Sequence, residues 1–265
     1  MWHESPAELQ RFARAVGGAW DALPPARRGR ALLVDNGSGP VAATARRELA
    51  ATLDREPETI ALPRNVGPTR ARNAAFARAS GGYVAALDAD GAPEPDLLDL
   101  LVRALDDDPG AALAAASVVS FDASPDRPAG TVELEWGPAG ATVYRRRALE
   151  ELGGFDELFE WTCEDMDFGY RARAAGWRCV GVPAALFRHE VAHKATAART
   201  FRFVEFLMVW RHVHFSRAVT LKSWLAQVPH LAVVGRQSGW PAAAGGVAGL
   251  FAYLRHIPAA ERRRR

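Results

Sequence analysis

A short apolar strand that ends in two carboxylates is the feature that most constrains the fold of this chain. The run 83–87 is apolar, has the length of a buried strand and precedes Asp88-Ala89-Asp90. Open α/β sheets place their ligands at strand ends, so we expect both carboxylates to face a crevice. Alternate residues of an extended segment face the same side, which lets Asp88 and Asp90 reach one cation, or a cation and a ribose. A solvated turn before a helix near Asp96 is the alternative for this motif alone.

A second apolar run, 30–34, also ends in polar residues. Asp35 follows it, and its carboxylate can accept a hydrogen bond from a base imide or a ribose hydroxyl. Gly37 and Gly39 permit positive φ and a close approach of the backbone. We therefore expect this turn to contact a nucleotide.

Between these strands, segment 63–75 predicts an anion site. It contains Asn65 and Gly67 and runs into an Ala-rich helix that carries Arg70 and Arg72. The amide groups of the first helical turn and the arginines would face the same crevice, where they suit a phosphate. A solvated helix face is the alternative for the arginines.

Apolar periodicity predicts alternating helices and strands over the first 120 residues. The expected helices are 6–22, 41–53, 68–79 and 95–105, and the expected strands are 30–34, 59–62, 83–87 and 112–119, with less regular strands at 132–136 and 141–144. This alternation predicts an α/β fold with a mostly parallel sheet and helices on both faces.

Composition limits the class of protein. A chain of 265 residues that is 49% hydrophobic can bury one α/β core and an appendage. The net charge of +2 is too small for a dedicated nucleic-acid binder. Cys163 and Cys179 lack CxxC spacing, and the N-terminus lacks a signal-peptide pattern, so we expect reduced core thiols and a cytoplasmic protein.

Taken in order, the sequence blocks of this chain resemble the family 2 glycosyltransferases of GT-A fold, a Rossmann-like α/β fold. The matching blocks are 34–38, 65–67 with 71–73, 87–90, 144–146 with 153–157, 164–167 with 171–177, and 182–189. Gly-Gly-Phe-Asp-Glu followed by Glu-Asp-x-Asp is most similar to the bacterial rhamnosyl- and galactofuranosyltransferase-like branch. The resemblance implies inverting, metal-dependent transfer from a UDP- or dTDP-type sugar to a glycan or polyprenyl-linked acceptor of the cell envelope.

The resemblance also assigns roles to donor-side residues. It implies Mg²⁺ or Mn²⁺ held by Asp90 and His189, with Asp88 as a further ligand or a ribose contact. His193 is a rival ligand to His189, for which a surface role is the alternative. The implied nucleotide contacts are Asp35, Asn65, Gly67, Arg72 and Asp88.

On the acceptor side, the family's Glu-Asp motif carries the catalytic base at its Asp, which is Asp165 here. Glu164 would orient the acceptor or substitute for the base, and we expect Asp167 to cap the following helix. The remaining acceptor contacts expected are Trp136 and Trp161, by stacking, and Gly153 and Gly154, by shaping a loop. A core role is the alternative for each tryptophan.

One departure from the family concerns the first strand. Members begin with a strand reading like Val-x-Val-x-Ile-Pro, whereas residues 1–6 already lead into the first helix. Either this central strand is absent or Met1 lies inside the true gene; loss of the strand would leave free edges on its two neighbours. This keeps open a non-catalytic nucleotide-sugar or carbohydrate-binding remnant. A sugar-nucleotide nucleotidyltransferase is a further alternative, but no Gly-rich phosphate loop with a catalytic Lys or Arg is evident near the N-terminus.

The sequence changes character near residue 200. We expect a GT-A domain at 1–199, with a donor half to about 120 and an acceptor half from 121, and a helical segment at 200–265. The stretch 237–254 is uncharged, but its Gly, Ser, Gln and Pro make it poorly apolar for a membrane span. We expect helices at the inner surface of the cell membrane, with arginines meeting anionic lipid; an ordinary helical cap is the alternative.

Overall fold

The structure is a computed structural model that describes residues 5–53, 55–190 and 196–264. The chain forms two compact units. The α/β unit comprises Met1–Phe155 and Phe168–Val191, and the helical unit comprises Asp156–Asp167 and Ala192–Arg265. The segment 156–167, which the sequence analysis assigns to the acceptor half, is therefore grouped with the C-terminal helices.

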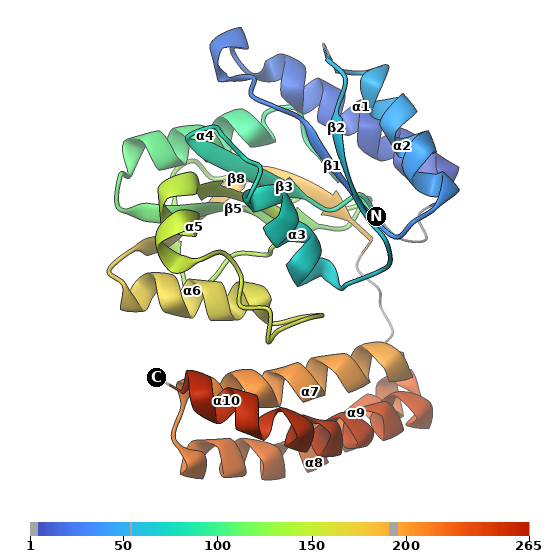
Figure 1. The fold of residues 1–265 in the computed structure, drawn as a ribbon, viewed down its shortest axis with the longest axis vertical. Coiled ribbons are helices and arrows are strands. Elements are labelled where there is room, and N and C mark those ends of the chain that lie inside the picture. Colours follow the sequence, from blue (N-terminus) through green and yellow to red (C-terminus); the bar gives the residue numbers. More distant parts are fainter. Residues whose placement is uncertain (1–4, 54, 191–195, 265) are drawn as a thin grey trace. The chain divides into compact units, whose positions relative to one another are not determined.

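The elements of the α/β unit follow the predicted alternation closely (Figure 1). Its helices are α1 (Pro6–Ala22), η1 (Pro25–Arg27), α2 (Pro40–Ala50), α3 (Pro68–Phe76), α4 (Leu97–Asp107), α5 (Arg146–Leu152) and α6 (Glu164–Ala174), whose first four residues are grouped with the helical unit. Its strands are β1 (Leu32–Asn36), β2 (Glu58–Leu62), β3 (Tyr83–Leu87), β4 (Gly91–Pro93), β5 (Ala111–Val119), β6 (Val132–Leu134), β7 (Ala141–Arg145) and β8 (Arg178–His189).

The strands form two separate sheets. β1 and β2 pair in parallel, and the six-stranded sheet has the order β3-β7-β5-β8-β4 with β6 also on β8. β3, β5 and β8 run in the same direction, while β4, β6 and β7 run against them. The predicted α/β architecture with helices on both faces is confirmed, and β4, β6 and β7 add antiparallel strands to it.

Within the described part of the chain, β1, β2, β3, β4 and β6 each pair with a single strand. β1 pairs only with β2, and β3 pairs only with β7. Ala85, in the middle of β3, is exposed, although a central strand of an α/β sheet is normally covered on both faces. The edges of β1 and β3 are thus free among the described residues.

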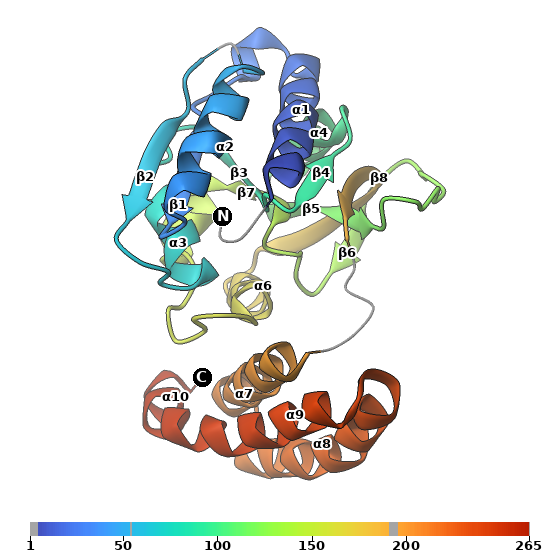
Figure 2. The ribbon, with the colours of Figure 1, turned by 90° about the vertical axis from the view of Figure 1, so that its right-hand side faces the viewer.

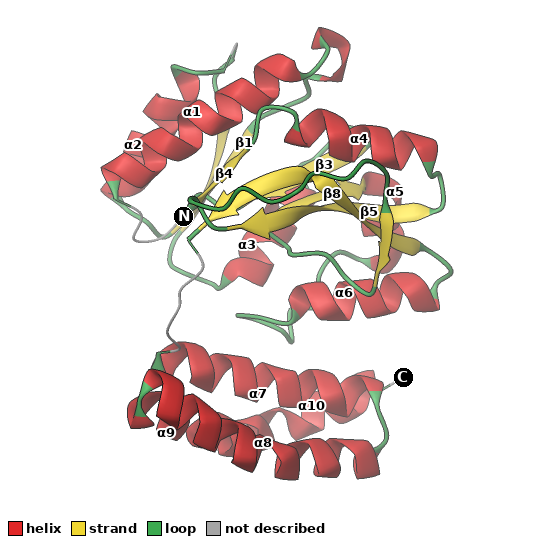
Figure 3. Ribbon diagram, turned by 180° about the vertical axis from the view of Figure 1, so that it is seen from behind, coloured by secondary structure: helices red, strands yellow, loops and turns green. Residues whose placement is uncertain are grey.

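Three apolar clusters hold the α/β unit together. α1 and α2 lie side by side and pack with Leu33 of β1 around Phe12 and Trp20 (Figure 1). The two faces of the larger sheet are covered by α4 and by α5 with α6 (Figure 3). Leu101 and Leu105 are fully buried on the α4 side, and Tyr144 and Phe168 are fully buried on the other. Burial of these side chains supplies the main stabilisation and fixes the strand ends that carry the candidate site.

The helical unit contains α7 (Ala197–His214), α8 (Arg217–Ser238), α9 (Trp240–Ala252), η2 (Tyr253–His256) and α10 (Ile257–Arg263), which pack as a bundle (Figure 2). Glycines let α9 approach α7 closely, because a Cβ at Gly249 would lie 2.4 Å from the carbonyl oxygen of Phe201. Among the described helices, none is both long and apolar enough to cross a membrane.

Candidate functional site

The structure brings Asp90 and His189 together, as the sequence analysis expects. Antiparallel pairing of β4 with β8 places Gly91 opposite His189, so the preceding Asp90 lies beside the imidazole. His189 Nε2 is 3.1 Å from Asp90 Oδ2, and both side chains remain partly exposed. A Cβ at residue 91 would lie 2.2 Å from the ring of Phe187, so glycine is needed for this approach.

Asp88 has a different partner from Asp90. The guanidinium of Arg72 donates to Asp88 Oδ1 at 2.7 Å, and the backbone N–H of Asp88 donates to the carbonyl of Gly140 at 2.8 Å. A Cβ at residue 140 would lie 2.0 Å from the Asp88 carboxyl carbon. Gly140 therefore leaves room for the carboxylate, a role that the sequence analysis missed. Arg72 positions Asp88 here, whereas the sequence analysis expects it to contact phosphate.

These residues fit a divalent cation that a nucleotide helps to hold. In the described part of the chain, no group of three or more His, Cys, Asp or Glu side chains is arranged to bind a metal. Mg²⁺ sites of phosphate enzymes commonly use one or two carboxylates and complete the coordination with phosphates and water. Asp90 and His189 can supply two donors, while Asp88 is held by Arg72. His193, the rival ligand, lies outside the described residues.

The loops after β1 and β2 are joined by a buried amide that the sequence analysis did not single out. Asn36 Nδ2 donates to Asn65 Oδ1 and to the carbonyl of Gly67, and Asn36 Oδ1 accepts from the N–H of Val66. Asn65 Oδ1 also accepts from the N–H of Gly67, the residue before α3. Asn65 and Gly67 thus shape the entrance to α3, where amide groups can face an anion.

The turn that follows β1 needs glycine, as expected. Gly37 has φ of 74°, and a Cβ there would lie 2.6 Å from the backbone nitrogen of Asn65. Asp35 Oδ1 accepts a hydrogen bond from the N–H of Ser38 at 2.7 Å, which closes the turn. The two polar loops are therefore in direct backbone contact.

The predicted acceptor loop at Gly153 and Gly154 is fixed by two side chains. Both glycines have positive φ, of 72° and 69°. Asn73 Nδ2 donates to the carbonyl of Phe155, and the N–H of Phe155 donates to Asn73 Oδ1, both at 2.9 Å. Arg171 donates to the carbonyls of Leu152 and Gly154 at 2.8 Å. The loop is thus held from both α3 and α6.

Trp136 lies against α6 in the α/β unit and is partly exposed. A Cβ at Gly169 would lie 2.6 Å from Trp136 Cβ and 2.4 Å from the carbonyl of Glu135. Gly169 therefore permits the helix to contact this segment directly. The remaining exposure of Trp136 leaves its predicted stacking on a sugar possible in this conformation.

The Glu-Asp motif lies at the start of α6, in the part grouped with the helical unit. Glu164 is buried, whereas Asp165 is partly exposed and accepts a hydrogen bond from the N–H of Met166 at 2.8 Å. Among the described non-glycine residues, only Cys163, directly before them, has a positive φ, of 68°. Such a conformation is unfavourable for a residue with a side chain and concentrates at functional segments.

Segment 156–167 is tied to the C-terminal helices by three pairs. His214 Nε2 lies 2.9 Å from Asp167 Oδ1, and both side chains are almost completely buried. Arg263 donates to Asp156 at 2.6 Å, and the guanidinium of Arg202 lies 3.6 Å from the centre of the Trp161 ring. The sequence predicts that Asp167 caps the helix, whereas its pairing with His214 was not predicted. One face of Trp161 is covered by Arg202 in this conformation.

Both cysteines are buried and free, as expected for core thiols. Burial raises the pKa of Cys163 far above its usual range, and the carboxylates of Asp165 and Glu164 raise it further. Burial also raises the pKa of Cys179 to about 11. A thiolate is the nucleophilic form of cysteine, so neither side chain is suited to nucleophilic chemistry at neutral pH.

Two family models match this chain. The model of glycosyl transferase family 2 matches residues 25–158, and that of glycosyl transferase family group 2 matches residues 138–227. Together they cover the strand ends, the Gly153-Gly154 loop and the Glu-Asp motif.

Two curated relatives from Mycobacterium tuberculosis are also named as sugar transferases. A pre-mycofactocin glycosyltransferase of strain H37Rv is 32% identical over 154 residues, which cover 50% of this chain and 32% of that protein. An N-acetylglucosaminyl-diphospho-decaprenol L-rhamnosyltransferase of the same strain is 40% identical over 68 residues, covering 26% of this chain and 20% of that protein. The matched parts thus span a third or less of these relatives.

Solved structures share the fold at low identity. GalNAc-T7 with UDP, GalNAc and Mn²⁺ has a TM-score of 0.62 at 15% identity, covering 79% of this chain and 46% of that chain. A mannosyltransferase from Pyrobaculum calidifontis in complex with GDP-Man and Mn²⁺ has a TM-score of 0.60 at 18% identity, covering 99% of this chain and 71% of that chain.

Proposed function

Because this chain belongs to glycosyl transferase family 2, we propose that it transfers a sugar, with inversion, from a UDP- or dTDP-type donor to a cell-envelope glycan or lipid-linked acceptor. The observation that carries the proposal is the pairing of Asp90 with His189 at the end of β8, next to the Asp88–Arg72 pair. The decaprenol named in one relative supports a lipid-linked acceptor.

The donor-side residues have distinct tasks in this proposal. Departure of a nucleoside diphosphate develops negative charge on the leaving oxygen. Asp90 and His189 would hold Mg²⁺ or Mn²⁺, which would neutralise that charge when bound. Arg72 keeps Asp88 oriented for a ribose hydroxyl or the same ion, while Asp35 and the Asn65–Gly67 turn contact the nucleotide. The Mn²⁺ in the related mannosyltransferase complex supports use of such an ion.

On the acceptor side, Asp165 takes the proton of the attacking hydroxyl and Glu164 orients the acceptor. Proton removal makes the hydroxyl oxygen a better nucleophile for attack on the anomeric carbon, on the face opposite the leaving group. The partial exposure of Asp165 supports this assignment, because a general base has to reach its substrate. Trp136, Trp161 and the Gly153-Gly154 loop would contact the acceptor.

The helical unit would lie on the inner surface of the cell membrane, where a lipid-linked acceptor is found. Leu221, Leu225 and Val228 are each more than half exposed and recur at spacings of four and three on α8, so they share one helix face. Phe251 and Leu254 are also more than half exposed. Exposed apolar groups beside arginines are typical of helices at a membrane interface.

The direct test of the donor site is calorimetry with UDP and dTDP, with and without Mn²⁺. We expect Mn²⁺ to strengthen binding about tenfold or more, about 1.4 kcal/mol, and we expect Asp90→Ala and His189→Ala to remove that gain. Asp107→Ala is the matched control, because Asp107 is an exposed carboxylate on α4. Equal binding with and without Mn²⁺ in the wild-type chain would contradict the metal assignment.

A non-catalytic nucleotide-sugar or carbohydrate-binding protein is the second candidate, and the free edges of β1 and β3 favour it. A missing central strand would remove part of the base pocket while leaving the Asp90–His189 pair intact. Metal-dependent nucleotide binding with no transfer to a broad panel of lipid-linked and synthetic glycan acceptors would support this candidate. Measurable transfer would exclude it.

A further inference from the structure

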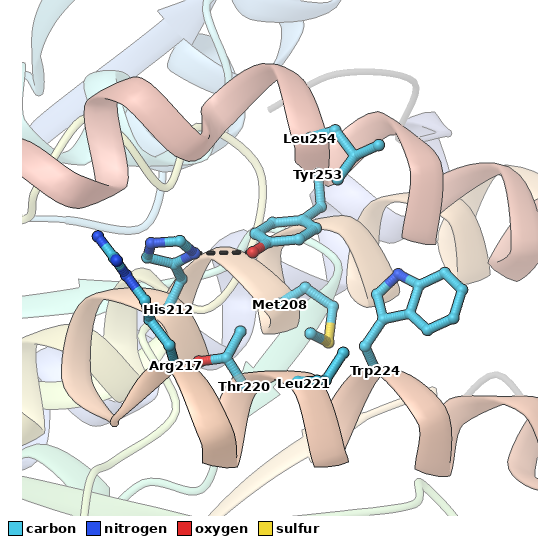
Figure 4. Close-up of a pocket in the computed structure, with 8 residues that line it drawn as sticks. All are labelled: Met208, His212, Arg217, Thr220, Leu221, Trp224, Tyr253 and Leu254. Carbon is cyan, nitrogen blue, oxygen red and sulfur yellow. Dashed lines mark hydrogen bonds between the residues drawn. The ribbon is translucent and has the colours of Figure 1, made fainter.

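A cavity of about 350 Å³ lies within the helical unit, among α7, α8 and η2 (Figure 4). None of the residues that line it belongs to the candidate transferase site. Its volume is at the lower end of the range of about 300–1,000 Å³ that small-molecule sites occupy. The cavity is therefore large enough for a small ligand and takes no part in the proposed sugar transfer, although Leu221 and Leu254 also belong to the exposed apolar surface of the helical unit.

One end of the cavity is polar. His212 is buried, with Nδ1 2.7 Å from the hydroxyl oxygen of Tyr253 and Nε2 2.9 Å from Glu261 Oε1. A carboxylate can only accept, so Nε2 carries a proton towards Glu261, and in the neutral imidazole Nδ1 accepts from the Tyr253 hydroxyl. Burial raises the pKa of Tyr253, which keeps this hydroxyl protonated at neutral pH. Arg217 lies at the same end and is largely exposed, while its guanidinium pairs with Glu261.

The other end of the cavity is apolar. Trp224 and Leu254 lie there in Figure 4, away from His212 and Arg217. Leu221 lies between the two ends on α8, and Met208 of α7, fully buried, forms the floor. Apart from the indole N–H of Trp224, ligand atoms at this end would meet only carbon and sulfur, which favours an aliphatic chain.

The charge around the cavity favours an anion. The helical unit, residues 156–167 and 192–265, has twelve Arg and Lys residues and eight Asp and Glu residues, an excess of four positive charges, and two of the carboxylates, Glu205 and Glu261, lie on α7 and α10. Both carboxylates already have cationic partners: Glu205 pairs with Arg255 and His256, and Glu261 pairs with Arg217. A negatively charged head group would thus meet a net positive field at the exposed Arg217.

We propose that this cavity binds a single-chain amphiphile, with its aliphatic chain between Met208, Leu221 and Trp224 and its anionic head at Arg217. The small volume fits one chain and excludes both chains of a diacyl lipid. A hydroxyl or phosphate oxygen near the head lies within the polar end formed by Tyr253 and Arg217. The site is independent of the proposed sugar transfer, so its test neither requires nor measures that activity.

The test is calorimetry of the full chain with decyl phosphate below its aggregation concentration. Leu221→Trp should fill the cavity and weaken binding at least tenfold. Leu225→Trp is the matched control, because Leu225 is 56% exposed on the same helix and does not line the cavity. Leu254→Trp closes the cavity from η2 and should weaken decyl phosphate binding equally. This second variant keeps the test valid if Leu221→Trp fails to fold.

The head group is tested separately. Arg217→Gln should weaken binding of decyl phosphate and leave binding of decyl maltoside, which has the same chain and an uncharged head, unchanged. Absence of decyl phosphate binding to the wild-type chain would overturn the proposal. Equal weakening by Leu221→Trp and Leu225→Trp would overturn it too, because it would indicate adsorption to the exposed apolar surface.

Co-sedimentation with phosphatidylglycerol vesicles then identifies the source of the amphiphile. If Leu221→Trp lowers both decyl phosphate binding and vesicle binding, the cavity takes a chain from the bilayer. If the variant loses only decyl phosphate binding, the ligand is an amphiphile free in solution. Both results retain the cavity as the binding site.

Discussion

The amide of Asn73 links α3 to the backbone of the predicted acceptor loop, and its removal should weaken the α/β unit measurably. Its two hydrogen bonds with Phe155, each 2.9 Å long, satisfy both the N–H and the carbonyl of that residue. Asn73→Ala leaves both groups without these partners at a residue whose side chain is 2% exposed. We therefore expect a loss of stability that is larger than an ordinary surface substitution produces.

The expected magnitude follows from the number of bonds. A hydrogen bond contributes about 0.5–1.5 kcal/mol, and a buried group left without a partner costs about 1–3 kcal/mol. Asn73 is itself partly exposed, so water can replace part of each bond and about 1–1.5 kcal/mol per bond applies. The total is about 2–3 kcal/mol, which corresponds to about a 30- to 140-fold change in an equilibrium constant.

Amide hydrogen exchange measured by mass spectrometry is the suitable assay, because it reports on one unit of a two-unit chain. Amides of β5 and β7 lie in the core and exchange through opening of the unit, so their rates should rise by that factor. Asn73→Asp keeps an acceptor for the N–H of Phe155 but loses the donor to its carbonyl, and should give an intermediate increase. Gln10→Ala, an exposed amide on α1, is the matched control and should change stability by less than about 0.5 kcal/mol.

Two results would refute this reasoning. The first is exchange in Asn73→Ala that stays within threefold of the wild-type rate, which would mean that the two bonds contribute little. The second is equal acceleration in Asn73→Ala and Gln10→Ala, which would mean that the bonds to Phe155 are not the cause.

Three further predictions concern the candidate site. Asp165→Asn should keep nucleotide binding while the transfer rate falls about a hundredfold or more, the scale of a lost general base. Glu164→Gln should lower the transfer rate less. An unchanged transfer rate in Asp165→Asn would remove the proposed base. Iodoacetamide at pH 8 should label neither Cys163 nor Cys179 in the folded chain, because their raised pKa values keep the thiols protonated. In denaturant it should label both. Rapid labelling of the folded chain, measured by mass spectrometry, would contradict this. Gly37→Ala should destabilise its turn by more than about 1 kcal/mol, which should appear as faster amide exchange over residues 63–75. Protection equal to wild type there would show that the backbone at Arg64 and Asn65 can shift to make room for the methyl group.

The sequence by itself determined the class of fold and the elements of the first half, except for β4, which it did not predict. Periodicity predicts a helix over 6–22, and α1 spans Pro6–Ala22 with a capping box between Ser5 and Glu8. The strands predicted at 59–62 and 112–119 are β2 and β5, each of which begins one residue earlier than predicted. These features depend on residues within a few positions of one another, so they can be predicted from the sequence. The ordered blocks likewise sufficed for the family, which the family model confirms.

The absence of the family's first strand stays a prediction made by comparison with the family. The roles of Asp165, Asp90 and the other candidate residues stay predictions, because the arrangement of side chains does not by itself establish a reaction.

Only the tertiary structure decided which side chains meet. Asp90 and His189 are 99 positions apart, and they come together because β4 and β8 pair in one particular register. A slip by one residue would turn His189 to the other face of the sheet. The pairing of Asp167 with His214 and the bridging amide of Asn36 depend in the same way on how distant elements pack. Local patterns set the conformation of each segment, but long-range contacts follow from burying all the apolar faces at once, and that is a property of the whole fold.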